Sequence, residues 1–373
     1  MGFTGIICEY NPLHLGHAKQ IRKIREEDPQ GGIVCLMSGN FVQRGKPAIF
    51  DKRIRAKAAV LAGADLVLEL PVTAALSSAE GFAAEGVRIL GSFCDKLCFG
   101  AETCDKDALM DTARKLLSAS FEDALREQLD KGLSFPAARQ AALGDAGAIL
   151  ETPNNILAVE YCKAILSQNS KMRPWPIHRE GSYHDTHADS ENPSATAVRQ
   201  LMEKSKNWEG YVPCPGLYKD AVVHSLLFGE KAMLAKLRTM TDGEFETVPY
   251  GSEGLWRKLM KACRTQCSLE DILTATKSKR YTRTRLDRMV MCAFLGLTEQ
   301  DLSSPAPYVR VLAFNDKGRE ILKHARQVGN FPNAGEKIDH PYQAIEDRCN
   351  SLYGLFAPTP ESPEDNTRVQ YVP

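Results

Sequence analysis

Two histidines near the beginning of the chain, His14 and His17, have the spacing and context of a phosphate-binding turn. An apolar segment precedes them, and a segment with the pattern of a helix follows. At a helix N-terminus, unpaired N–H groups and the positive end of the dipole favour an anion, and Gly16 lets the backbone approach it closely. Two imidazoles can donate hydrogen bonds to oxygens that gain charge during attack at phosphorus. The alternative is a pair of exposed turn histidines, but the position between a first strand and a first helix favours a triphosphate site.

A second candidate group follows the last expected strand. Ser194 or Thr196 can cap a helix, which is the simpler interpretation. Their hydroxyls and the free N–H groups of a helix start can also hold phosphate oxygens, with Arg199 one turn further on as a fixed cation. This group is placed to close the same crevice from the other side.

The segment after the second expected strand is also polar. Residues 37–48 contain Ser, Asn, Gln, Arg and Lys, so we interpret them as a loop that holds an acceptor or a triphosphate, rather than as a solvated loop. Of the next cations, Lys52, Arg53 and Arg55, at least two are expected on the solvent face of a helix.

Further candidates lie at the ends of later strands and at one helix start. Gly100 would let a flat base or ribose pack against the backbone, and Glu102 could bond a hydroxyl or cap the next helix. An asparagine at a helix start, here Asn154 or Asn155, is usually a cap but can also bind a base or ribose. Arg179 ends the fifth expected strand.

No protein-bound metal is predicted. His184 and His187 follow the fifth strand, but no third residue has the spacing of a metal ligand. Cys94, Cys98 and Cys104 lack the spacing of a zinc site and are expected to be buried thiols.

One segment of the second half is strongly basic. Residues 277–288 carry six basic residues in twelve and run into an apolar stripe with helical spacing. A solvated helix is the simpler interpretation, but a cluster of cations in a neutral protein favours contact with an RNA backbone. The candidate RNA-binding residues are Lys279, Arg280, Arg283 and Arg285.

These residues need a scaffold, and the pattern before residue 206 predicts an α/β fold. Short apolar strands alternate with helical segments, which is typical of a Rossmann-like, doubly wound parallel sheet. The expected strands are Phe3–Cys8, Gly32–Met37, Leu66–Leu70, Lys96–Phe99 and Trp175–Arg179. The expected helices are Ala18–Glu26, Arg53–Ala62, Ala79–Leu90, Asp107–Leu129 and Asn155–Ser167.

The pattern changes after about residue 206, where strand patterns largely vanish. We expect a catalytic domain at 1–205, a mostly α-helical C-terminal domain at 206–357 and a flexible, proline-rich tail at 358–373. The expected helices of the second domain are Tyr218–Leu227, Lys231–Met240, Leu255–Cys263, Leu269–Thr274, Thr284–Gly296 and Asp316–Val328.

The composition sets limits on location and partners. The 373 residues exceed one ordinary core, and 47 basic residues balance 47 acidic ones, so RNA binding requires a local patch. The 11 cysteines without a secretory signal indicate reduced thiols in the cytoplasm. No apolar run is long enough to cross a membrane, and nothing indicates an obligate protein partner.

The motifs also resemble known families. The strand, His14-x-x-His17 and helix, together with Ser194-x-Thr196-x-x-Arg199, resemble the HxGH nucleotidylyltransferase superfamily. Longer strings between residue 3 and about residue 315 resemble the bacterial tRNA(Met) cytidine acetate ligase family. They are GIICEYNPLHLGH, MSGNFVQRGKPA, ADLVLELP, CFGAE, NNILAVEY, the Tyr183-His184-Asp185 step, SATAVR and KRYTRTRLDR.

The resemblance implies a two-step reaction. ATP and acetate form acetyl-adenylate and pyrophosphate, and the acetyl group then passes to N4 of the wobble cytidine of elongator tRNA(Met). It also implies ATP contacts at Gly100, at Arg179, and at Asn154 or its neighbour Asn155. The implied ATP loop consists of Ile7, Cys8, Glu9, Tyr10, Asn11, Pro12, Leu13, His14, Leu15, Gly16, His17, Ala18, Lys19 and Gln20.

Adenylation is an in-line displacement at the α-phosphorus, which needs positioning and charge stabilisation more than a protein nucleophile. We therefore expect His14 and His17 to stabilise the transition state, and Ser194, Thr196 and Arg199 to hold the departing pyrophosphate. Cys8 is expected to pack in its strand rather than carry an acyl group. ATP usually brings Mg²⁺, whose part the sequence leaves open.

Two other functions fit part of the pattern. A small-molecule adenylyltransferase would use the same histidine turn but would leave the basic segment idle. A nucleotide- or RNA-binding protein without catalysis would not need both histidines together with Arg199.

Overall fold

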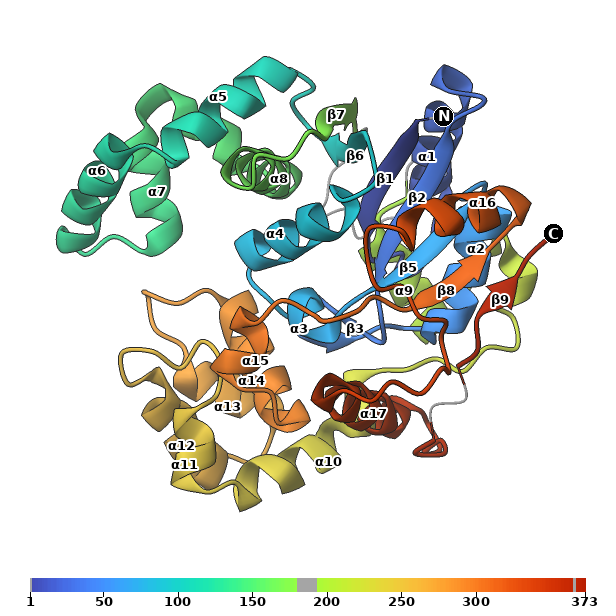
Figure 1. Ribbon diagram of the computed structural model, residues 1–373. Coiled ribbons are helices and arrows are strands. Elements are labelled where there is room, and N and C mark those ends of the chain that lie inside the picture. Colours follow the sequence, from blue (N-terminus) through green and yellow to red (C-terminus); the bar gives the residue numbers. More distant parts are fainter. Residues whose placement is uncertain (1, 180–192, 365–366) are drawn as a thin grey trace.

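Seven strands form the central sheet, in the order β7-β6-β1-β2-β5-β8-β9 (Figure 1). The computed structural model describes residues 2–179, 193–364 and 367–373. The strands of this sheet are β1 (Phe3–Cys8), β2 (Gly32–Ser38), β5 (Leu66–Leu70), β6 (Lys96–Ala101), β7 (Arg173–His178), β8 (Val311–Phe314) and β9 (Gln370–Tyr371). A separate hairpin joins β3 (Phe41–Val42) to β4 (Lys46–Pro47).

The helices follow the strands in two groups. Those up to residue 217 are α1 (Leu15–Glu27), α2 (Lys52–Leu61), α3 (Val72–Ala75), α4 (Ala79–Leu90), α5 (Lys106–Leu116), α6 (Ala119–Asp130), α7 (Phe135–Leu143), η1 (Gly144–Glu151), α8 (Pro153–Ser167), α9 (Ala195–Glu203), η2 (Glu209–Tyr211) and η3 (Pro215–Leu217). The later ones are α10 (Leu226–Thr239), α11 (Asp242–Glu246), α12 (Leu255–Thr265), α13 (Leu269–Thr276), α14 (Arg283–Leu295), α15 (Glu299–Ser303), α16 (Asp316–Ala325), α17 (Pro341–Tyr353) and η4 (Gly354–Phe356).

The strand order has one reversal, and it lies at β1. From β1 the chain moves through β2 to β5, and it then returns to the opposite side of β1 to form β6 and β7. All of these neighbours are parallel. The loops that follow β1 and β6 therefore diverge at one point of the sheet edge, which is where ligands bind in such folds.

Both faces of the sheet are buried, as expected for parallel strands. Alternate residues of β2 belong to two different cores: Leu36 packs on one face of the sheet and Cys35 on the other. Helices α4, α8 and α16 cover the first face, and α1 and α2 cover the second. The predicted doubly wound α/β fold is confirmed.

Strand β7 closes one side of the sheet. The N–H groups of Arg173 and Arg179 point to β6, where they bond the carbonyls of Asp95 and Ala101. The intervening positions that face away from β6 include Pro174 and Pro176. Because proline has no N–H, this edge offers little to a further strand.

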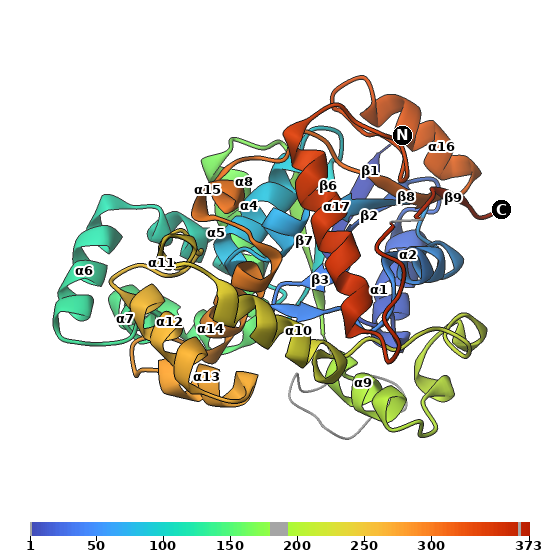
Figure 2. The ribbon, with the colours of Figure 1, turned by 90° about the horizontal axis from the view of Figure 1, so that it is seen from below.

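A third core lies under helices α10 to α14 and α17. Figure 2 shows α17 between these helices and the sheet. The β3–β4 hairpin contacts this helical part through Gly45 (φ +69°), where a Cβ would lie 2.5 Å from the carbonyl carbon of Asp287. Such close contact with the backbone of α14 requires glycine.

The structure corrects two predicted helices. The helix expected at Asp107–Leu129 is two helices, because the hydroxyl of Ser118 accepts the N–H of Phe121 (3.3 Å) and starts α6. Residues 218–225 are not helical: Tyr218 packs its ring on Phe50, with centroids 4.9 Å apart, and α10 begins only at Leu226.

Strand patterns after residue 206 were missed. β8 pairs antiparallel with β5 and parallel with β9, and α16 packs on the sheet. The last residues, expected in a flexible tail, include β9 and the buried Val372. The sheet is thus built from both ends of the chain. Among the described residues, no helix is long and apolar enough to span a bilayer.

Candidate active site

The two histidines lie at the junction of β1 and α1, as predicted. His14 is the N-cap of α1, and its Nδ1 accepts the N–H of Gly16 (3.2 Å). The N–H of His14 in turn donates to Nδ1 of His17 (3.3 Å), and the two rings stack with centroids 3.7 Å apart. Because both Nδ1 atoms accept hydrogen bonds, each neutral ring carries its proton on Nε2.

The Nε2 atom of His14 is a buried donor without a partner. The residue is 2% exposed, and its Nε2 makes no hydrogen bond within the part of the chain that the structure describes. A buried donor left unpaired costs about 1–3 kcal/mol. A ligand oxygen at this point would remove that cost, so the geometry favours a bound acceptor.

Both imidazoles are held neutral. Burial lowers the pKa of His14 to about 3, and the charges of Arg179 and Arg199 act in the same direction. Burial also lowers the pKa of His17 well below its usual value, with further contributions from His14 and Arg179. The charges of the two arginines thus act on His14, and that of Arg179 also acts on His17, and a positive field of this kind suits a polyphosphate.

The second motif lies next to the first. The Ser194 hydroxyl caps α9 by accepting the N–H of Ala197 (3.0 Å). The guanidinium of Arg199 donates to the carbonyl of Asn11 (2.6 Å) and to Oγ1 of Thr196 (3.1 Å). Residues 188 positions apart in the chain are thus in contact, and the structure brings the two motifs together.

Arg179 belongs to a hydrogen-bonded chain on the other side. It donates to Oδ1 of Asn154 (3.0 Å), whose amide donates to Oε1 of Glu102 (2.7 Å). Burial would raise the pKa of Glu102, but hydrogen bonds from Asn154 and Thr152 outweigh it and hold the pKa below its usual value. The carboxylate therefore stays charged and orients Asn154 and, through it, Arg179.

The neighbouring residues Asn154 and Asn155 form different hydrogen bonds. Asn155 is buried, and its Oδ1 accepts the N–H groups of Glu102 and Thr103 (both 3.0 Å). Asn154 is half-buried and accepts a hydrogen bond from Arg179, so Asn154 is the candidate ligand contact. At Gly100 a Cβ would meet only the side chain of Arg179, at 3.8 Å, so the lack of a side chain there is not required by protein packing.

Most side chains of the implied ATP loop face the protein. Ile7, Tyr10, Leu13 and Ala18 are buried. The Asn11 side chain accepts the N–H of Ile49 (2.8 Å), and a cis bond joins Asn11 to Pro12. These residues shape the loop, and any contact they make with a ligand would come from backbone groups.

The remaining loop residues vary in exposure. Glu9 accepts the N–H of Gln43 (2.8 Å), and Gln20 reaches the carbonyl of Cys98 (3.5 Å). Leu15 is half-buried and Lys19 is exposed. Cys8 packs in its strand as expected, and burial raises the pKa of its thiol, so it is poorly suited to carry an acyl group.

Arg55 is the residue that sequence reasoning missed. Its fully buried guanidinium donates to the carbonyls of Glu9 (2.7 Å), Ser38 (3.0 Å) and Phe50 (2.9 Å), and also to that of Gly39. It thereby joins the loops that follow β1 and β2. The sequence offered one indirect indication of this role. Loops that follow strands leave backbone carbonyls without strand partners, and such carbonyls need other donors.

The prediction that at least two of the three cations of α2 lie on its solvent face was wrong. Lys52 is buried and pairs with Glu69 (3.1 Å), while Arg55 binds carbonyls. Only Arg53 is exposed, where it pairs with Asp51. Buried cations are retained here because acceptors surround them.

The cysteine predictions have a mixed outcome. Cys94 and Cys98 are buried as expected, but Cys104 is exposed. Among the described residues, no three His, Cys, Asp or Glu side chains are grouped as metal ligands. Tyr183, His184, Asp185 and His187 lie outside the described residues.

The basic segment is more neutralised than its sequence suggests. Arg280 pairs with Glu253 (2.9 Å), and Arg283 pairs with Glu270 (2.6 Å) and Asp287 (3.0 Å). Arg285 donates to the carbonyl of Tyr250 (2.9 Å). Lys279 is exposed. Because Arg280 and Arg283 are paired with acids, the net positive charge of this segment is smaller than predicted.

Comparisons with known proteins agree with this architecture. Residues 1–366 match the model of the HIGH Nucleotidyl Transferase family. The tRNA(Met) cytidine acetate ligases of Clostridium novyi and Clostridium tetani are 39% and 36% identical, each alignment covering 89% of both chains. The crystal structure of Thermotoga maritima TmcAL superposes with a TM-score of 0.90 in its apo form and 0.87 when bound with alpha-thio ATP, at 30% identity over 100% of both chains. This chain therefore belongs to the HIGH nucleotidyl transferase family and, within it, to the tRNA(Met) cytidine acetate ligases.

Proposed function

We propose that this chain activates acetate with ATP and transfers the acetyl group to N4 of the wobble cytidine of elongator tRNA(Met), forming N4-acetylcytidine. The observation that carries the proposal is the pair of neutral imidazoles at the start of α1, with an unpartnered Nε2 donor on His14. Its relatives bear the name of this ligase.

In the first step, an acetate oxygen attacks the α-phosphorus and pyrophosphate leaves. The N–H groups at the start of α1 and the Nε2 protons of His14 and His17 would donate to the phosphate oxygens that gain charge. Neutral imidazoles can donate hydrogen bonds without giving up a proton, so neither histidine needs to act as an acid.

The departing pyrophosphate would be held by the second motif. The guanidinium of Arg199 donates to Asn11 and Thr196. A fixed cation at this place, with Ser194 and Thr196 at the start of α9, suits a leaving group that carries several charges. Mg²⁺, which ATP normally carries, would be bound through the phosphate oxygens.

On the other side of the crevice, Gly100, Asn154 and Arg179 would contact the adenosine and its phosphate. Glu102 already orients Asn154 and, through it, Arg179. Positioning of this kind lowers the barrier because the reacting groups are held close together before the reaction starts.

In the second step, N4 of the cytidine attacks the acetyl carbonyl carbon, AMP leaves, and N4 loses a proton. An unpaired RNA base can enter a cleft of this kind, and the bound RNA would keep water from the adenylate. The C-terminal part of the chain, residues 206–357, would bind the tRNA, with Lys279, Arg280, Arg283 and Arg285 among the contacts. The reaction would take place in the cytoplasm and would need no partner protein.

One assay tests the proposal. The protein is incubated with ATP and labelled acetate, with and without tRNA, and acetyl-adenylate and labelled RNA are measured. Adenylate in both mixtures and label in elongator tRNA(Met) are expected. Adenylate with another acid, or with no RNA labelling, would favour a small-molecule adenylyltransferase, and no adenylate with any acid would favour a protein that only binds.

A further inference from the structure

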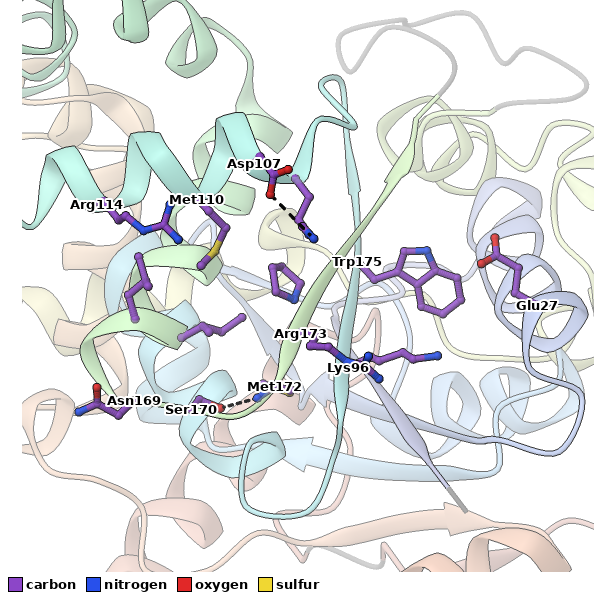
Figure 3. Close-up of a pocket in the computed structure, with 14 residues that line it drawn as sticks. Glu27, Lys96, Asp107, Met110, Arg114, Asn169, Ser170, Met172, Arg173 and Trp175 are labelled. Carbon is purple, nitrogen blue, oxygen red and sulfur yellow. Dashed lines mark hydrogen bonds and ion pairs between the residues drawn. The ribbon is translucent and has the colours of Figure 1, made fainter.

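A hollow lies at the opposite end of the sheet from the histidines (Figure 3). Its volume is about 810 Å³, and it lies between α5, the end of α8 and the first residues of β6 and β7. The histidine site lies at the other ends of the same strands. Each strand has six residues, so at ~3.3 Å per residue the two sites are about 20 Å apart. We call this hollow the β7 pocket.

The lining of the β7 pocket combines cations with an aromatic ring. Lys96, Lys106, Arg114 and Arg173 line it, against the two acids Glu27 and Asp107. The Trp175 ring is half-buried, and Nζ of Lys96 lies 5.2 Å from its centroid. Figure 3 shows Trp175 and Lys96 together on one side of β7, with Met110 and Arg114 on the other.

Several of these charges are available to a ligand. Arg173 is exposed, and its side chain has no ion pair or hydrogen bond to any other described residue. Lys96 reaches Asp28 only at 4.0 Å, and Lys106 reaches Asp107 at 3.8 Å. Exposed pairs of this length contribute little, so a phosphate can displace them. The arginines of the basic segment, by contrast, are tied closely to Glu253, Glu270 and Tyr250.

The pocket is built for side-chain recognition. The prolines at positions 174 and 176 remove N–H groups from the outer edge of β7, which disfavours an added peptide strand. The lining thus offers the ring of Trp175, apolar side chains that include Met110 and Met172, and cations. A nucleotide, with a flat base and a phosphate, matches these groups.

We propose that the β7 pocket binds a nucleotide of the substrate RNA other than the reacting cytidine, with its base on Trp175 and its phosphate on Arg173. This inference rests on the proposed function, because it supposes an RNA substrate. RNA-binding modules contact stretches as long as ~16 base pairs, so one RNA can reach both the histidine crevice and a pocket about 20 Å away.

The test uses the full chain with Arg173→Glu and Trp175→Leu, and measures tRNA affinity by filter binding at several salt concentrations. Trp175→Leu should weaken binding by roughly ten- to a hundred-fold, since each stacked base contributes ~1–3 kcal/mol. Trp175→Phe keeps an aromatic ring and should keep most of the wild-type affinity for tRNA. Arg173→Glu should weaken binding about ten-fold and reduce the salt slope by roughly one.

The matched control is Lys323→Glu, which makes the same charge change at an exposed position of α16, on the far side of the sheet from β7. It should bind tRNA as the wild type does. Acetyl-adenylate formation without RNA should remain at the wild-type rate in every variant, because the pocket is remote from the histidines.

The outcomes separate the two proposals. Unchanged tRNA affinity in both pocket variants, with normal adenylate and RNA acetylation, would overturn the pocket inference and leave the proposed function standing. A wild-type protein that makes no adenylate and binds no tRNA would overturn the proposed function itself. Equilibrium dialysis with labelled CMP provides a further arm: CMP binding that needs Trp175, with tRNA binding that does not, would assign the pocket to a free nucleotide and overturn the RNA assignment.

Discussion

At the scale of single residues, the proposed chemistry depends on two imidazoles that burial and nearby positive charges keep neutral. Burial removes the water that would stabilise an imidazolium, and the nearby positive charges oppose protonation further. The hydrogen bonds at Nδ1 leave the Nε2 protons to a ligand. The histidines are therefore prepared as donors rather than as acids or bases.

Replacing His17 by alanine tests this role. The change should slow acetyl-adenylate formation by roughly 10²- to 10³-fold, as expected for the loss of one preorganised donor. Pyrophosphate release measures the rate, and a thermal melt checks the fold. The matched control is His324→Ala, at an exposed position of α16, which should keep wild-type turnover. Near-normal turnover in His17→Ala would contradict the assignment.

The low pKa of His14 also predicts how stability depends on pH. Between the usual value of 6.5 and about 3, the unfolded chain binds a proton that folded His14 does not. The contribution of His14 is therefore present above pH 6.5 and is lost as the pH falls, by up to ~1.4 kcal/mol per pH unit. His14→Asn keeps a good capping residue. As the pH falls from 6.5 to 4, its free energy of unfolding in urea should decrease less steeply than that of the wild type. Equal slopes would show that His14 protonates freely in the folded state.

At the scale of elements, the site depends on loops that tertiary contacts hold together. Arg55 on α2 joins the loops after β1 and β2 through their carbonyls, and Arg199 on α9 holds the carbonyl of Asn11. Each helix thus fixes the backbone of the turn that carries the histidines. The basic segment differs, because two of its arginines form exposed ion pairs with Glu253 and Glu270 and hold no loop of the site.

Arg55→Lys is expected to damage both stability and activity. A lysine ammonium cannot reach four carbonyls at once, and each buried acceptor left without a partner costs about 1–3 kcal/mol. The free energy of unfolding in urea should fall by roughly 3 kcal/mol, and adenylate formation should fall with it. Arg53 is an exposed residue of the same helix. The free energy of unfolding of Arg53→Lys should therefore stay within about 0.5 kcal/mol of the wild-type value. A stable, active Arg55→Lys protein would show that the carbonyl contacts are dispensable.

At the scale of the whole molecule, the sheet and the helical part are interdependent. β8 and α16 come from the second half of the chain yet complete the sheet beside β5. The hairpin after β2 contributes Phe41 to the core of the helical part. The expected division near residue 205 is therefore crossed in both directions.

Residues 1–205 expressed alone should fail to fold cooperatively. Without β8, strand β5 would present an open, apolar edge, and such edges promote aggregation. Size-exclusion chromatography and thermal unfolding followed by circular dichroism would measure this, with the full chain as the reference. A monomeric fragment with a sharp transition would show that the division predicted from the sequence is a true domain boundary.

The sequence by itself determined those features that depend on neighbours in the chain. Alternating apolar strands and helices predicted the five parallel strands to within two residues, and the histidines were placed correctly because a strand, a cap and a helix start are adjacent along the chain. The short strands β8 and β9 and the cap at Ser118 were missed, since a few residues carry little periodicity.

Tertiary structure alone decided what depends on distant partners. It buried Arg55 among carbonyls of three segments, brought Arg199 to Asn11, and paired the arginines of the basic segment with acids elsewhere. The charge state of His14 was settled in the same way, because the pKa follows burial and the nearby charges of Arg179 and Arg199. Burial and long-range electrostatics arise only when the chain is packed, and no local pattern encodes them.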